Sequence, residues 1–320
     1  MRTLVAVQTV RHARADQFLN PDATDGVRVK VALLFNPRAG QGASLGALRH
    51  LLVRAGHELV RVIDRKDDAA RLAEPPVELA VAAGGDGTIA AAAKALAGST
   101  VPLAILPVGT ANNIGFTLGL SAPAERLVSG WESARLQPFD LGVIGCNGST
   151  RRFVEGIGGG LVESCMREIR TQPVPSDDPP RQLVPALRRY ADALRRLEPR
   201  PWVFFVDGER RTGDFLLVEV LNASAVGPNL ELAPGSNTCD GLLTVVTARE
   251  EHRSRLAEYI DDRLSGRTSR LELPTESATR VDVSSPRPMH VDDALMDASS
   301  TPLTIQVEPG AVTVLVPQPS

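Results

Sequence analysis

The sequence predicts a two-domain protein, with a Rossmann-like α/β domain of three layers followed by a β-rich, sandwich-like domain. Between residues 29 and 135, apolar runs of strand length alternate with helical patterns, which is typical of a parallel sheet covered on both faces. From Pro201 onward most apolar segments have the length of strands. The 320 residues are enough for two domains that each bury a core.

The first 28 residues are polar and irregular, and we treat them as an N-terminal extension. In the α/β domain, residues 29–135, Val29, Val31, Leu33 and Phe35 alternate with other residues as in a strand. Further strands are expected at 57–63, 79–84 and 102–107, and helices at 45–55, at 66–73 and in the alanine-rich segment after residue 88.

The β-rich domain is expected over residues 136–305. The glycine cluster at 156–160 is expected to open a helix that ends near Arg170, and its glycines would allow close backbone packing. Residues 306–320 are expected to return to the first domain. Two more helices are expected at 181–197 and 253–264, and strands at 136–144, 152–156, 202–206, 215–221, 242–246, 281–283, 303–307 and 312–316.

Composition excludes several classes of protein. The net charge is −3, whereas nucleic-acid-binding proteins are usually strongly basic, so no nucleic-acid partner is expected. The three cysteines show no paired spacing and no metal motif, which favours a reducing cytoplasm. No apolar run reaches the roughly 18 residues that span a bilayer. We therefore expect a cytoplasmic protein, and the sequence leaves open whether it forms a homo-oligomer.

Two glycine turns mark the candidate site. The first, Gly84-Gly85-Asp86-Gly87-Thr88, follows one buried strand, and the second, Gly109-Thr110-Ala111-Asn112-Asn113, follows the next. The carboxyl ends of neighbouring parallel strands lie at the same edge of a sheet, where ligands bind. Glycine lets the backbone approach a phosphate, and a helix N-terminus offers unpaired N–H groups. The turns therefore predict a nucleotide-phosphate site, although the chain has no P-loop motif.

The first turn resembles the Gly-Gly-Asp-Gly-Thr signature shared by diacylglycerol, sphingosine and NAD kinases and, more distantly, phosphofructokinases. Three further motifs resemble those of the lipid kinases, one of them a turn that NAD kinases lack, and their order and spacing match over nearly the whole chain. The chain is therefore identified as a member of the bacterial diacylglycerol/sphingosine-type lipid kinase superfamily, with its NAD-kinase-like fold. The motifs are Asn36-Pro37 with Gly40, Pro107-Val108-Gly109-Thr110-Ala111-Asn112-Asn113, and Asn222…Gly227…Ala233-Pro234…Asp240-Gly241-Leu242.

The resemblance implies that ATP and Mg²⁺ bind between the domains and that a lipid hydroxyl accepts the γ-phosphoryl group. It also implies that Asp292 is the general base, that Asp86 takes part in catalysis, that Asp140 lies on the substrate side, and that Asp240 is a metal ligand. The nucleotide side would comprise Asn36, Gly84, Gly85, Asp86, Gly87, Thr88, Gly109, Thr110, Asn112 and Arg181.

Three positions depart from the family pattern: Asn113 and Thr238 replace acidic residues, and Ala294 replaces the glutamate of Asp-Gly-Glu. In an extended segment, residues 292 and 294 point the same way and residue 293 points away, so Asp293 is not expected to replace that glutamate.

The leading hypothesis is an ATP-dependent lipid kinase that acts on a diacylglycerol- or sphingoid-like hydroxyl at the inner membrane face, through peripheral contact. A kinase for another hydroxylated substrate is an alternative. The three substitutions also motivate a catalytically impaired protein that binds nucleotide or lipid and has a regulatory role.

Overall fold

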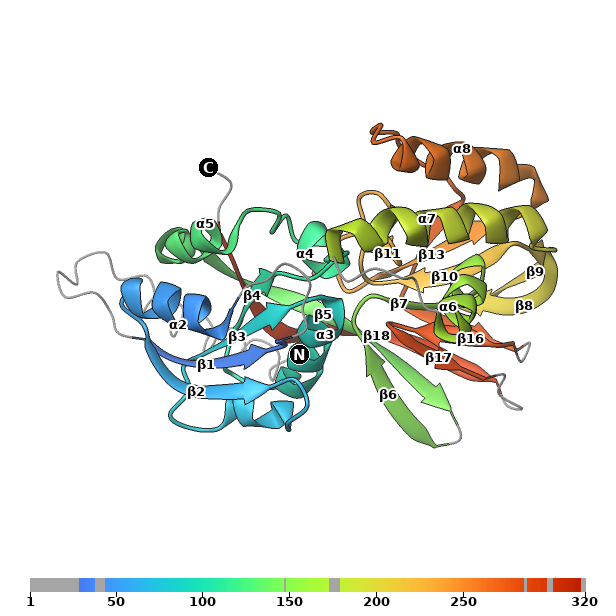
Figure 1. Ribbon diagram of the computed structural model, residues 1–320. Helices are drawn as coiled ribbons and strands as arrows, with labels where there is room; N and C mark the ends of the chain where they lie inside the picture. The colour runs from blue at the N-terminus through green and yellow to red at the C-terminus, as the bar shows by residue number, and fades with distance from the viewer. Residues whose placement is uncertain are drawn as a thin grey trace.

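The structure is a computed structural model, and it describes residues 29–37, 44–146, 148–172, 179–284, 287–297 and 302–317. The expected extension at 1–28 and the motif residue Gly40 lie outside these ranges. Figure 1 shows two lobes side by side, the first mostly blue to green and the second running from green at β6 through yellow to red, with the dark-red β18 also reaching into the first lobe. Within the described segments, no helix is both long and apolar enough to cross a membrane.

The first lobe contains a parallel sheet in the order β2-β1-β3-β4. Every residue of β3 is buried, as expected for a strand with helices on both faces. The alanines of α3 let this helix pack closely on the sheet. The strands are β1 (Lys30–Phe35), β2 (Glu58–Asp64), β3 (Leu79–Gly84) and β4 (Leu103–Pro107), and the helices are α2 (Leu45–Arg54), η1 (Ala69–Ala73), α3 (Asp86–Leu96), α4 (Asn113–Thr117), α5 (Ala124–Ser129) and η2 (Trp131–Ser133).

A long antiparallel pair, β5 (Arg135–Cys146) and β18 (Leu303–Val316), runs through both lobes. The end of β18 pairs with β4 in parallel, at Val314 and Leu315. Its beginning pairs with β15 in the second lobe. The register of the pairing between β18 and β5 shifts between Glu308 and Val312. The large sheet continues beyond β18 through β15 (Arg280–Val283), β8 (Arg200–Val206) and β9 (Glu209–Phe215), while β6 (Ser149–Phe153) pairs with β5.

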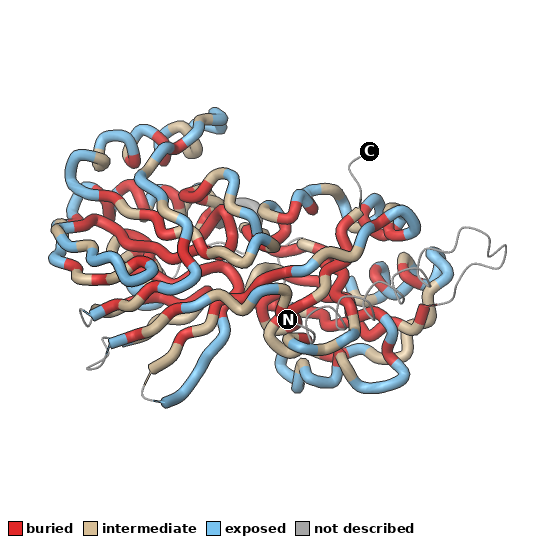
Figure 2. The backbone as a smooth tube through the Cα atoms, turned by 180° about the vertical axis from the view of Figure 1, so that it is seen from behind, coloured by how far each residue is buried: buried red, intermediate tan, exposed pale blue. Residues whose placement is uncertain are grey.

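The second lobe adds a six-stranded antiparallel sheet in the order β14-β13-β10-β7-β16-β17. Apolar residues such as Phe153, Trp202 and Phe204 fill the space between this sheet and the large one. Figure 2 shows that buried residues are concentrated in the interior of both lobes, whereas exposed residues lie mainly at the periphery, on outer helices, turns and projecting hairpins. The strands are β7 (Gly156–Gly160), β10 (Leu217–Leu221), β13 (Leu243–Ala248), β14 (Thr275–Ala278), β16 (Met289–Val291) and β17 (Ala294–Met296), with a small pair β11 (Ala225–Val226) and β12 (Leu230–Glu231), and the helices are α6 (Leu161–Thr171), α7 (Pro179–Arg196), η3 (Glu250–His252) and α8 (Arg253–Leu264).

This architecture confirms the predicted fold class, an α/β domain followed by a β-rich sandwich. The expected helix start in the glycine cluster is wrong, because residues 156–160 form β7 and α6 begins at Leu161. The cluster allows β7 to lie close to its neighbour β10. A side-chain carbon on Gly158 would lie 2.0 Å from Oε2 of Glu219.

Candidate active site

The two glycine turns touch each other at the ends of β3 and β4. A side-chain carbon on Gly109 would lie 2.2 Å from the Cα atom of Gly85, so neither turn can carry a bulky residue there. Asn112 adopts a left-handed conformation with φ of 58°, and its Oδ1 accepts the N–H of Gly109 at 2.8 Å. Thr88 is buried beneath the first turn, against Gly84. The surface where the two glycine turns meet is therefore formed mostly by backbone atoms.

Asp86 is the first residue of α3, directly after the extended Gly85. Its Oδ1 accepts the N–H of Ile114, in the first turn of α4, at 3.0 Å. Burial raises the pKa of the Asp86 carboxyl above its usual value, and hydrogen bonds from backbone N–H groups at residues 112–114 offset only part of this effect. The position thus combines a helix N-terminus with a carboxylate that binds a proton more readily than an exposed one.

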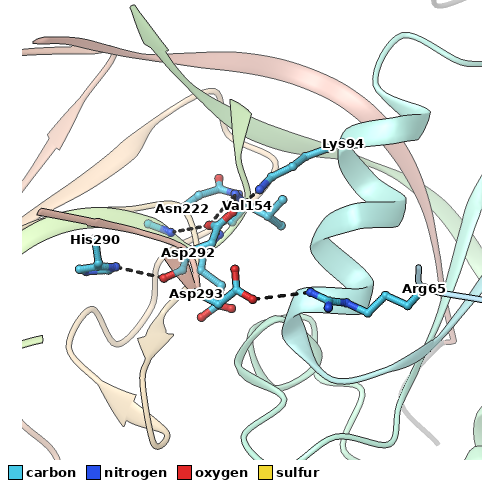
Figure 3. Close-up of polar contacts among 9 residues, drawn as sticks. Arg65, Lys94, Val154, Asn222, His290, Asp292 and Asp293 are labelled. Carbon is cyan, nitrogen blue, oxygen red and sulfur yellow. Dashed lines mark hydrogen bonds and ion pairs between the residues drawn. The ribbon is translucent and has the colours of Figure 1, made fainter. Parts of the chain in front are cut away.

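A second turn with aspartates faces these glycines from the other lobe. Asp292 and Asp293 connect β16 to β17, and Asp292 has a positive φ of 49°. Oδ1 of Asp292 accepts the N–H groups of Val154 at 3.0 Å and of Glu155 at 2.8 Å. Its Oδ2 lies 2.6 Å from Nζ of Lys94, a residue of α3, so this ion pair joins the two lobes (Figure 3).

The turn corrects the expectation that Asp293 points away from the site. Residues 292–294 are not one extended segment, because the hairpin reverses direction at Asp292 and Asp293. The exposed carboxylate of Asp293 lies 3.6 Å from the Arg65 guanidinium (Figure 3). A side-chain carbon on Gly87 would lie 3.0 Å from Oδ2 of Asp293. Asp293, rather than Asp292, is therefore the carboxylate in direct proximity to the glycine turn.

His290, in β16, supports this hairpin from within the second sheet. Its Nε2 lies 2.8 Å from Oε2 of Glu219, and its Nδ1 lies 3.2 Å from the carbonyl oxygen of Asp292. Burial lowers the pKa of His290, but its two acceptor partners outweigh burial and the net pKa is raised. An imidazolium can donate to both partners at once.

Asn113 and Glu155 form a buried pair close to both aspartates. The side-chain amide of Asn113 donates to Oε2 of Glu155 and to the carbonyl oxygen of Gly227, each at 3.1 Å. Burial, followed by the nearby charges of Asp86 and Asp292, raises the pKa of Glu155 well above its usual value. Sequence reasoning missed Glu155, Lys94 and Arg65. The only local signal for Glu155 is a lone carboxylate between apolar residues and glycine.

Other predicted residues have different surroundings. Asp140 is buried, and its two carboxylate oxygens accept the N–H groups of Gly241 at 2.8 Å and Gly310 at 2.6 Å. Asp240 is exposed, and its Oδ1 accepts the N–H of Leu242 at 3.0 Å. The substrate and metal roles assigned to these two aspartates remain predictions.

The remaining predicted nucleotide residues can be placed only in part. Asn36 follows β1, and its N–H donates to the carbonyl oxygen of Ala83 at 3.3 Å. Thr110 is half-buried in the second glycine turn. Arg181 belongs to α7, but its side chain lies outside the part that the structure describes.

Comparisons with known proteins identify the family of this chain. Residues 30–144 match the diacylglycerol kinase catalytic domain, and residues 183–316 match the YegS C-terminal NAD kinase beta sandwich-like domain. A protein of Cronobacter sakazakii named "Probable lipid kinase YegS-like" is 31% identical over 66% of this chain and 71% of that protein. This chain belongs to the diacylglycerol kinase family of lipid kinases.

Two further relatives cover nearly the full length of this lipid kinase. A diacylglycerol kinase of Mycobacterium tuberculosis is 28% identical, over 90% of this chain and 96% of that protein. A crystal structure of a diacylglycerol kinase from Bacillus anthracis has the same fold, with a TM-score of 0.68 and 22% identity over 92% of this chain and 99% of that chain. Membership of the family makes this chain a phosphotransferase with an alcohol group as acceptor.

The lipid kinase site fits phosphates better than it fits a metal ion held by protein alone. Gly85, Gly87 and Gly109 carry no side chains, so a phosphate can approach the backbone closely at the start of α3. Across the described segments, no group of three or more His, Cys, Asp or Glu side chains is arranged to hold a metal ion. Mg²⁺ usually binds through one or two carboxylates together with phosphates and water, so Asp293 is a suitable ligand.

Proposed function

We propose that this lipid kinase transfers the γ-phosphoryl group of ATP to the hydroxyl group of a diacylglycerol- or sphingoid-like lipid. The contact between Gly85 and Gly109 carries this proposal, because it presents two strand-end turns as one backbone surface at the start of α3. Such a surface suits phosphate groups. The names of the curated relatives support a lipid as the acceptor.

Charges from both lobes can orient the phosphates. The Arg65 guanidinium lies beside Gly87, where a side-chain carbon would be 2.7 Å from one of its nitrogens. Asp293 is its ion-pair partner and is largely exposed, so it can serve as a Mg²⁺ ligand. Bound Mg²⁺ would neutralise charge on the transferring phosphoryl group. In this proposal Arg65 binds phosphate and Asp293 holds the metal ion.

The proton acceptor is assigned to Asp86 in preference to Asp292. A general base works best when its pKa is close to the working pH, and burial raises the pKa of Asp86 in that direction. Asp292 instead uses both carboxylate oxygens for contacts within the protein, to backbone N–H groups and to Lys94. Asp86 accepts the hydroxyl proton, and Asp292 joins the lobes around it.

Peripheral membrane contact is assigned to α7. Val184 is 41% exposed and stands one helical turn before the exposed Arg188, on the same helix face. Exposed apolar and arginine side chains on one face suit an anionic lipid surface. Arg195 and Arg196 contribute less, because Asp192 and Glu168 already neutralise them at 2.7 Å and 2.9 Å.

The test is phosphoryl transfer from labelled ATP and Mg²⁺ to a panel of diacylglycerols, sphingoid bases and isoprenoid alcohols in mixed micelles. We expect transfer to a lipid, and loss of nucleotide binding by calorimetry in Gly85→Val. Gly46→Val, at an exposed position of α2, is the control that should bind normally. Nucleotide binding without transfer to any acceptor would favour the regulatory alternative, and normal binding by Gly85→Val would contradict the site.

A further inference from the structure

Glu155 is a buried carboxylate where the two lobes meet, between the end of β6 and the start of β7. Its N–H donates to Oδ1 of Asp292 at 2.8 Å, and its carbonyl oxygen accepts the N–H groups of Asn222 at 2.9 Å and Ala223 at 3.0 Å. These bonds fix the backbone of Glu155 in the second lobe. Its side chain extends to Asn113 in the first lobe.

The partner of Glu155 is one of the three positions that depart from the lipid kinase pattern. The family turn has an aspartate where this chain has Asn113. Oε2 of Glu155 lies 3.1 Å from Nδ2 of Asn113, so a carboxylate is still present within hydrogen-bond distance of position 113. The Glu155 carboxylate comes from the second lobe, and the Asn113 amide lies in the turn of the first lobe.

A short chain of contacts connects this pair to the proposed proton acceptor. Asn113 is the first residue of α4, and the next N–H, from Ile114, binds Oδ1 of Asp86 at 3.0 Å. The Asn113 amide is held by Glu155 and by the carbonyl oxygen of Gly227. A shift of Asn113 would therefore move the N–H group that orients Asp86.

We propose that Glu155 is a positioning residue of the kinase site and that it supplies, from the second lobe, the carboxylate that the family turn carries at position 113. The proposal rests on the proposed function, since it assigns a role in orienting Asp86. Asn113 and Glu155 act as one carboxylate–amide pair, so a carboxylate is retained beside position 113 although the turn itself carries an amide.

The carboxylate and the amide can be exchanged between the two positions without changing the shape of either side chain. Asn113→Asp and Glu155→Gln are isosteric single variants, and the double variant Asn113→Asp with Glu155→Gln places the carboxylate in the turn and the amide at position 155, between β6 and β7. Glu163→Gln is the matched control, because Glu163 is also a buried carboxylate but pairs with Arg167 within α6. Lipid phosphorylation, nucleotide affinity and thermal unfolding are measured for all five proteins.

We expect each single variant to lower kcat about 10- to 100-fold, as small misplacements of catalytic groups do, with nucleotide Kd within about twofold of wild type. Asn113→Asp brings two carboxylates together at this pair, and Glu155→Gln removes the single carboxylate of the pair. The double variant should be more active than either single variant. It should stay below wild type, because the carbonyl oxygen of Gly227 then loses its donor. Glu163→Gln should keep its kcat.

A double variant whose loss of kcat equals the product of the two single losses would overturn the proposal, as would wild-type turnover in Glu155→Gln. Thermal unfolding gives a second, independent test of the pairing. Asn113→Asp should lower the melting temperature, and adding Glu155→Gln should restore part of that loss, whereas additive changes would contradict the pairing. If the wild type phosphorylates no acceptor, the proposed function fails, and the unfolding cycle still decides whether the two residues are coupled.

Discussion

The two turns that meet between the lobes hold their aspartates in opposite ways. In the glycine turn, Asp86 stands at the start of α3, and burial raises its pKa. In the hairpin turn, Asp292 is fixed by two short backbone hydrogen bonds and by the Lys94 ammonium. Burial therefore disfavours the charged form of Asp86, whereas the carboxylate of Asp292 is held in place by N–H donors and an ion pair. The comparison separates a carboxylate suited to chemistry from one suited to holding the domains together.

The largest expected effect is on turnover in Asp86→Asn. Removing the proton acceptor should lower kcat by about 10²- to 10⁴-fold, while the protein stays folded. Its melting temperature should be unchanged or higher, because burial disfavours the charged form that the substitution removes. Initial rates of lipid phosphorylation and calorimetric melts measure both quantities, with Asp261→Asn on the exposed face of α8 as control. Turnover within threefold of wild type would reverse the assignment.

Asp292→Asn should affect stability more than Asp86→Asn does. A neutral amide weakens the ion pair with Lys94, which is partly exposed, and places an amide where two N–H donors converge. We expect a loss of about 2 kcal/mol in the free energy of unfolding, typical for hydrogen bonds to a charged group. Denaturant titrations of both variants compare the two turns directly. If Asp292→Asn kept wild-type stability and lost 10²-fold or more in kcat, Asp292 would be the base and the comparison would fail.

His290→Gln tests the second support of the hairpin through pH. The folded protein raises the pKa of His290 above its usual value of about 6.5, so its charge stabilises the fold fully below that pH. This stabilisation is lost as pH rises from the pKa of His290 in the unfolded chain to its pKa in the folded protein. The loss is about 1.4 kcal/mol for each pH unit in that interval. The difference in melting temperature between wild type and variant should therefore shrink from pH 6 to pH 9. Melts of the exposed His50→Gln variant at the same pH values are the control.

The smallest expected effect on stability is that of Asp293→Asn. Its ion pair with Arg65 is 3.6 Å long and exposed, and such pairs contribute about 0–1 kcal/mol. The melting temperature should change by about 1 °C or less, while the Mg²⁺ concentration needed for half-maximal turnover rises. An unchanged Mg²⁺ requirement would remove Asp293 from the metal site.

The glycine turn could be predicted from the sequence because its determinants are local. The buried strand, the glycines, Asp86 and the helix lie within a few consecutive residues, and parallel topology places the second turn beside the first. The hairpin turn depends on contacts between distant segments: Lys94 and Asp292 are 198 residues apart in the chain. No pattern around Lys94 or Glu155 indicates such partners.

The predicted direction of Asp293 was wrong although the local sequence contained a signal for the hairpin. Two aspartates between the short segments Met289-His290-Val291 and Ala294-Leu295-Met296 fit a two-residue hairpin loop, which favours residues that tolerate positive φ. The interpretation as an extended segment ignored that signal, and it therefore assigned the wrong direction to Asp293.

The path of β18 has a consequence for synthesis on the ribosome. The core of the first domain includes Ala311, Val312 and Val314–Val316, which lie about 200 residues beyond β4 in the chain. The edge of β4 that pairs with β18 stays open until those residues have been made. Domains usually fold in the order in which they are synthesised, but here the N-terminal domain cannot be completed before the second domain has been translated. A nascent chain stalled before residue 303 should therefore expose that apolar edge to chaperones.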